Sequence, residues 1–141
     1  MPETCVKRNA NVGFLAYSPL AGGVLTGKYQ NPESMPADGR LNLFKGFMGR
    51  YRNSESERAV KKYMAIAEEF GVTPGMLALK YVYSRGWVTS TIVGATKTSH
   101  IRENLRSLNI PLDEKHYQQI QDVYLEFRDP TIPKRLEPVA K

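Results

Sequence analysis

Two short segments of the sequence combine glycines, hydroxyl side chains and a lysine in patterns that suit phosphate binding. In the first, Gly22 and Gly23 follow an apolar run, and Lys28 stands five residues after Gly23. Glycines after a buried strand let backbone N–H groups approach a phosphate closely, and a lysine adds a compact positive charge. The second segment, residues 93–105, passes from a glycine through hydroxyl residues into a helix, whose N-terminus favours anions.

The first segment also has the spacing of a P-loop, because Gly22, Gly27 and Lys28 match Gly-x4-Gly-Lys. That motif requires a serine or threonine after the lysine to hold Mg²⁺, and Tyr29 stands there instead. A P-loop also begins a helix at the lysine, whereas the Gln-Asn-Pro that follows Tyr29 is typical of a turn. We therefore reject a nucleoside-triphosphatase.

The second segment has an alternative explanation in helix capping. The hydroxyl groups of Thr96, Thr98 and Ser99 can donate to a phosphate, and Lys97 or His100 can add positive charge. A threonine there is also an ordinary N-cap, because its hydroxyl oxygen accepts from the first free N–H groups of a helix. From the residues alone, anion binding and plain capping by Thr96 or Thr98 both stay open.

Strands and helices alternate along the chain, which indicates a parallel α/β arrangement. Two apolar runs, 12–17 and 87–93, predict strands that are buried on both faces, and a glycine-rich irregular stretch fills residues 18–53. Ser54 and Glu57 have the spacing of a capping box, which predicts the start of the first helix. Apolar spacing and end signals predict helices at about 54–70, 73–85, 98–107 and 113–127, with Thr73 as the cap of the second. The fourth helix has an apolar stripe that is most simply core packing, formed by Tyr117, Ile120, Val123, Tyr124 and Phe127.

Two strands are too few for a sheet of this kind. A lone parallel pair would expose its ladder edges and its apolar faces to water. The sequence therefore predicts more sheet than these two runs supply.

The composition is that of one soluble globular domain of 141 residues with a net charge of +6. The single cysteine, Cys5, excludes an intrachain disulfide and a cysteine-rich metal site, and it favours the cytoplasm. No apolar run reaches the ~20 residues of a membrane span, so we expect no membrane partner. The basic residues interleave with acidic ones and match no recognition motif, so we expect no nucleic-acid partner.

The two segments together resemble the aldo-keto reductase family, and its Tas-like branch most. Residues 16–29 match that family's "AYSPLxxGxLTGKY" segment, and residues 94–104 match its "GAxxxxxxxEN" segment, in the same order. The likeness covers residues 11–127. It implies the C-terminal part of a (β/α)8 TIM barrel, with strands 7 and 8 and their helices, over residues 1–129, followed by an extended tail, 130–141.

The resemblance implies that this chain binds the cofactor NADP(H). The aromatic residue at Tyr17 matches a position that lies against the nicotinamide ring. Ser18, Pro19, Leu20, Ala21 and Gly22 match the loop over the pyrophosphate, Lys28 and Arg40 match cofactor-binding cations, and Gly94, Thr96, His100, Glu103 and Asn104 match the positions around the adenosine end.

Two residues depart from the family pattern and leave the choice between NADPH and NADH open. Thr96 replaces a common serine and keeps the hydroxyl group. His100 stands where glutamine or arginine is usual, and a neutral histidine is the weaker phosphate partner. Lys97 is positioned in the sequence to compensate.

The resemblance also implies the reaction, a hydride transfer between NADPH and an aldehyde or ketone. In the family, the four catalytic side chains come from the first half of the barrel, so we predict no catalytic residue and no metal ligand in this chain. We expect the chain to be part of a longer reductase whose N-terminal half is its partner. The alternatives are an inactive nucleotide-binding piece and a short protein that completes its sheet with another chain.

Overall fold

The sheet consists of two short parallel strands. The computed structural model describes residues 11–44, 46 and 48–132. In it β1 (Leu15–Ala16) pairs with β2 (Ser90–Thr91) in parallel. The parallel pairing confirms the expected arrangement. The strands are shorter than the predicted runs, 12–17 and 87–93, because each has one neighbour and the ladder ends where that neighbour turns away.

Four longer helices occupy the four predicted regions. They are α3 (Ser54–Glu69), α4 (Pro74–Tyr83), α5 (Thr98–Arg106) and α6 (Glu114–Phe127). The predicted cap of α4 is confirmed, since Thr73 Oγ1 accepts from the Met76 amide at 3.2 Å. Asp113 caps α6 in the same way, with Oδ1 2.9 Å from the His116 amide nitrogen.

The predicted capping box of α3 is wrong by one residue. The N-cap is Asn53, whose Oδ1 accepts from the Ser56 amide at 2.9 Å, and Ser54 is already helical. An asparagine caps a helix as well as a serine does. The same side chain donates from Nδ2 to the Arg50 carbonyl at 2.7 Å, so it joins the preceding turn to the helix.

The stretch between β1 and α3 was predicted to be irregular, and it contains several short helical turns. These are η1 (Ala21–Thr26), η2 (Pro32–Ser34), α2 (Arg40–Leu43) and η3 (Gly49–Tyr51). The turns pack on α3 through a small apolar cluster in which Ala21, Val24, Leu41 and Val60 are buried. The segment that follows β1 is therefore anchored to the helical layer.

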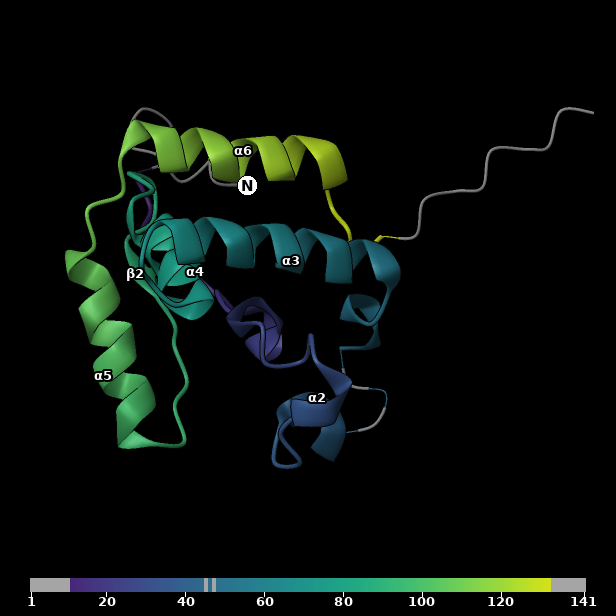
Figure 1. Cartoon of the computed structure of the whole chain (residues 1–141). Helices are drawn as coiled ribbons and strands as arrows, with labels where there is room; N and C mark the ends of the chain where they lie inside the picture. Colours follow the sequence, from purple (N-terminus) through teal and green to yellow (C-terminus); the bar gives the residue numbers. More distant parts are fainter. Residues whose placement is uncertain (1–10, 45, 47, 133–141) are drawn as a thin grey trace, which may run out of the picture.

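The main core lies among α3, α4 and α6. Figure 1 shows α3 and α6 side by side, with α4 beside them. The buried members of this core are Ala59, Ile66, Ala67, Leu77, Ile120, Val123 and Phe127. The predicted apolar stripe of α6 is confirmed at its centre, while Tyr124 of the same stripe is largely exposed.

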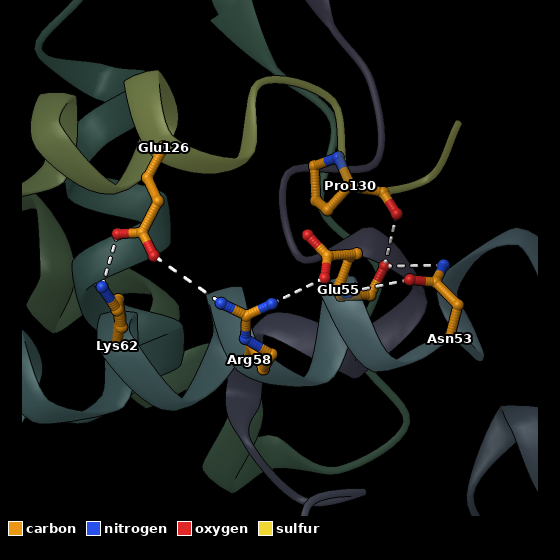
Figure 2. Close-up of polar contacts among 7 residues, drawn as sticks. Asn53, Glu55, Arg58, Lys62, Glu126 and Pro130 are labelled. Atoms are coloured by element: carbon orange, nitrogen blue, oxygen red, sulfur yellow. Dashed lines mark hydrogen bonds and ion pairs between the residues drawn. The ribbon is translucent and has the colours of Figure 1, made fainter. Parts of the chain in front are cut away.

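Polar contacts link the end of α6 to the start of α3 (Figure 2). Glu126 of α6 pairs with Lys62 and lies 4.0 Å from Arg58, both on α3. Ser56 Oγ donates to the Pro130 carbonyl at 3.1 Å. The chain just after α6 is thus fixed to α3, and the rest of the predicted tail, 133–141, lies outside the described residues.

In contrast, the strands and α5 leave apolar side chains in water. Leu15 of β1 is 60% exposed, and α5 has no buried residue. Figure 1 shows α5 at the left edge of the view, away from α6. This agrees with the prediction that the strands call for a larger sheet. In the described part of the chain, no helix is long and apolar enough to cross a membrane.

Candidate functional site

The loop after β1 adopts an unusual backbone conformation. Ser18 and Ala21 have positive φ values of 57° and 49°, and Gly22 and Gly23 continue with 67° and 95°. Left-handed conformations are costly for residues other than glycine and are concentrated at functional sites. Tyr17, just before this loop, is 75% exposed. The strained loop therefore lies at the end of the strand, beside an exposed aromatic ring, and its Ala21 and Gly23 amides donate within the loop at 3.0 and 2.8 Å.

The glycines of this loop allow a close approach by neighbouring side chains. A Cβ on Gly23 would lie 2.9 Å from Lys28 Cε, and a Cβ on Gly22 would collide with Met48 Sδ. The Lys28 ammonium lies 5.1 Å from the centre of the Tyr29 ring. The Lys28 side chain is therefore folded over the glycines, where its charge can neutralise an anion bound at this loop.

The second segment leads into α5 with an open helix end. Its N-cap is Lys97, and no side chain caps the helix within the described residues. Plain capping by Thr96 or Thr98 is therefore wrong for this structure. Both threonines, together with Gly94 and His100, are exposed. An uncapped helix N-terminus has free N–H groups that can donate hydrogen bonds to an anion.

Glu103 and Asn104 are both half-buried, and Glu103 faces the helical layer. The Glu103 carboxylate accepts a hydrogen bond from Thr73 Oγ1, the hydroxyl that caps α4. A Cβ on Gly75, in the first turn of α4, would lie 3.5 Å from Thr26 Cγ2 and 4.0 Å from Glu103 Oε1. The two sequence segments thus meet at the N-terminus of α4, although more than seventy residues separate Thr26 from Glu103.

A second link joins the long loop to the start of α5. Lys97 Nζ lies 3.5 Å from Asp38 Oδ2, and both side chains are mostly exposed. Exposed ion pairs of this kind contribute little stability, so the pair can exchange with another anion. Arg40, the first residue of α2, is exposed and close in sequence to Asp38.

Met48 and Arg50 are site residues that sequence reasoning missed. With Tyr17 and Gly49 they line an open hollow of about 400 Å³. Their approach to Tyr17 depends on the left-handed conformation of Met48, with φ of 55°. No spacing rule connects residue 17 with residue 50, so the sequence carries no signal for this contact.

The arrangement fits a phosphate-bearing cofactor. A strained loop, a lysine folded over its glycines and an uncapped helix N-terminus all lie after the C-terminal ends of two parallel strands. Phosphate sites in α/β folds favour this edge of the sheet. Among the described residues, no group of three metal-ligating side chains is close enough to hold a metal ion.

Comparison with known proteins decides the family. The model of the aldo/keto reductase family matches residues 1–125. This chain belongs to the aldo/keto reductase family. An aldo-keto reductase from Babesia bovis is 37% identical over 132 residues, which are 91% of this chain and 46% of that protein. Protein tas from Escherichia coli is 37% identical over 125 residues, 89% of this chain and 36% of that protein.

The family also includes relatives with other names. A probable voltage-gated potassium channel subunit beta from Arabidopsis thaliana is 39% identical over 104 residues, 72% of this chain and 31% of that protein. The resemblance to the aldo-keto reductases and to their Tas-like branch is thereby confirmed. The family implies a TIM barrel, and the two parallel strands with flanking helices are consistent with part of one. The chain spans less than half the length of these relatives.

Proposed function

We propose that this chain is the NADP(H)-holding part of an oxidoreductase that transfers a hydride between NADPH and an aldehyde or ketone. Two observations carry the proposal: the two phosphate-type segments meet at the N-terminus of α4, where Thr26 and Glu103 both lie beside Gly75, and α5 begins without a side-chain cap. A dinucleotide has two phosphate-bearing regions, so two such segments at one edge of the sheet suit it better than a single anion site would.

Each predicted residue has a role in this proposal. Tyr17 lies against the nicotinamide ring, and the backbone of residues 18–22 covers the pyrophosphate, with Lys28 as its cation. Gly94, Thr96, His100 and Asn104 surround the adenosine end. Glu103 positions α5 against α4 through its hydrogen bond with Thr73. Arg40 approaches the cofactor from the long loop.

The choice between NADPH and NADH depends on Lys97 in this proposal. A 2′-phosphate carries negative charge that competes with Asp38 for the Lys97 ammonium, at present 3.5 Å from that carboxylate. His100 is exposed and adds a hydrogen-bond donor. We propose NADPH as the preferred cofactor because Lys97 can exchange one anionic partner for another.

In the same proposal β1 and β2 are strands 7 and 8 of the barrel, and the proton donor for the carbonyl group comes from the other strands. The exposed apolar side chains of the strands and of α5 support this. Ile101, Leu105 and Leu108 follow one another at helical spacing, and each is about half exposed. A contiguous apolar face of this kind marks an interaction surface. The partners are thus the remaining barrel and a small carbonyl substrate, in the cytoplasm.

A titration of the chain with NADPH tests the cofactor site. We expect saturable binding, measured by cofactor fluorescence. Lys28→Ala and Asn104→Ala should each raise the Kd about tenfold or more, because each removes a hydrogen bond to a charged or buried group. Trp87 is a poor reporter, since it packs edge-on against Phe14, with ring centres 5.2 Å apart, before the strands begin.

Lys61→Ala is the matched control, because Lys61 is an exposed lysine of α3 outside the proposed site. Its Kd should equal that of the unaltered chain. The absence of saturable binding up to millimolar NADPH would contradict a cofactor site in this chain. Addition of the N-terminal half of a related reductase, followed by an assay with 4-nitrobenzaldehyde, then separates an active barrel from an inactive nucleotide-binding piece.

A further inference from the structure

A hollow of about 400 Å³ lies on the exposed side of Tyr17. Its other walls are Met48, Gly49 and Arg50, from the far end of the long loop. In the proposed function, the Tyr17 ring faces the reacting end of the cofactor. The hollow is then a space beside the reacting end of the cofactor that a substrate can enter.

The wall opposite Tyr17 is held in place from several directions. The Met48 side chain packs so closely on Gly22 that a Cβ there would collide with it. Tyr51 packs against the apolar cluster of the long loop and α3. The Arg50 carbonyl accepts from Asn53 Nδ2 at 2.7 Å, at the cap of α3. The turn that carries Arg50 is therefore fixed by these contacts, and it places Arg50 near Tyr17.

The guanidinium of Arg50 is oriented but has no anionic partner among the described residues. Its Nη2 donates to Tyr51 Oη at 3.3 Å, and its carbon lies 5.0 Å from the centre of the Tyr51 ring. The hydrogen bond with Tyr51 is the first cause that raises the pKa of Arg50, and weaker interactions with Tyr17 and Asp129 add to it. No carboxylate within the described ranges lies within ion-pair distance of Arg50.

We propose that this hollow binds the anionic group of the carbonyl substrate, a carboxylate or a phosphate, on Arg50. This inference rests on the proposed function. A guanidinium presents paired N–H donors that match the two oxygens of such a group. The site therefore favours acidic aldehydes and ketones over neutral ones.

Paired probes of similar shape test the proposal on the 141-residue chain without cofactor. The probes are 4-carboxybenzaldehyde, which is anionic, and 4-nitrobenzaldehyde, which is neutral. Binding is followed through the amide NMR signals of Tyr17 and Gly49. We expect the anionic probe to bind about tenfold more tightly, because a hydrogen bond to a charged group is stronger than one between neutral groups. Inorganic phosphate, added as a competitor, shows whether a phosphate takes the same place.

Variants of Arg50 then assign the preference to its side chain. Arg50→Gln should abolish the tenfold preference. Arg50→Lys should retain part of it, because lysine keeps the positive charge but lacks the paired N–H donors of the guanidinium. Arg106→Gln, at an exposed arginine in the last turn of α5, should leave the preference unchanged. Equal binding of the two probes, or a preference that survives Arg50→Gln, would overturn the proposal.

The experiment distinguishes this inference from the proposed function because it needs no nucleotide. An Arg50-dependent preference in a chain that does not bind NADPH supports the anion site and removes the cofactor role. NADPH binding that depends on Lys28, without any preference for the anionic probe, supports the cofactor role and overturns the anion site.

Discussion

Helices α6 and α5 have similar sequence patterns and opposite surroundings. Both carry apolar residues at helical spacing, and both follow a strand or loop in the second half of the chain. In α6 the stripe is buried, with Phe127 only 4% exposed against α3. In α5 the corresponding Leu105 is 58% exposed. The α5 stripe has no cover among the described residues.

The difference in burial between α6 and α5 indicates that α6 stabilises the fold and that α5 offers surfaces for binding. The packing of α6 on α3 and α4 forms the main core and fixes the long loop through α3. Helix α5 contributes an uncapped N-terminus and an uncovered face, and it is tied to the rest chiefly through α4. In the proposed function, the N-terminus of α5 binds an anion and its apolar side packs on the rest of the barrel. Both surfaces are therefore uncovered in this chain.

The largest expected effect tests the buried and exposed stripes directly. Phe127→Ala should lower the free energy of unfolding by ~3–5 kcal/mol, because it leaves a cavity in the core. Leu105→Ala, the matched change in α5, should cost less than ~0.5 kcal/mol, as an exposed substitution does. Urea denaturation followed by circular dichroism measures both. A comparable loss in Leu105→Ala would mean that the α5 stripe is buried in solution.

The helical layer was largely predictable from the sequence, because its signals are local. Apolar spacing and end signals identified all four helices, and the predicted cap at Thr73 is confirmed. The errors concern N-cap residues, at positions where two neighbouring residues are both suitable caps. Asn53 and Ser54 are both good N-caps, and at α5 Lys97 takes the N-cap position between two threonines.

The site was predictable only in part. The meeting of the two glycine segments follows from a general rule, that parallel strands bring their C-terminal ends to one edge of the sheet. The wall formed by Met48 and Arg50 depends on a left-handed methionine and on its packing against Gly22. Such contacts arise from the path of a loop of more than thirty residues, and no residue pattern encodes that path.

A smaller effect on the free energy of unfolding is expected at the two helix starts, of which α3 has a side-chain cap and α5 has none. Asn53→Ala should lower the free energy of unfolding by ~1 kcal/mol, because the side chain accepts from the Ser56 amide. Lys97→Ala removes no side-chain cap and breaks only an exposed ion pair, so it should cost a few tenths of a kcal/mol at most. Thermal unfolding of the two variants compares them. Equal losses would show that Lys97 stabilises α5 in a way that its N-cap geometry does not reveal.

The smallest expected effect concerns the acid sensitivity of the contact between α3 and α6. Hydrogen bonds from Lys115 and Gln119 of α6 lower the pKa of Glu69 from its ordinary 4.5. A carboxyl group whose pKa is lowered in the folded state stabilises the fold above the unfolded pKa, and this contribution disappears as the pH falls through the folded pKa. Glu69→Gln should therefore be less stable than the unaltered chain at pH 7, and the two should converge below about pH 4.5.

Urea denaturation across this pH range measures the difference. Glu68→Gln is the control, because Glu68 is exposed on the same helix and has no side-chain contact with α6 among the described residues. Its difference from the unaltered chain should stay constant with pH. A Glu69→Gln difference that persists unchanged into acid would show that α6 is held to α3 by its apolar stripe alone.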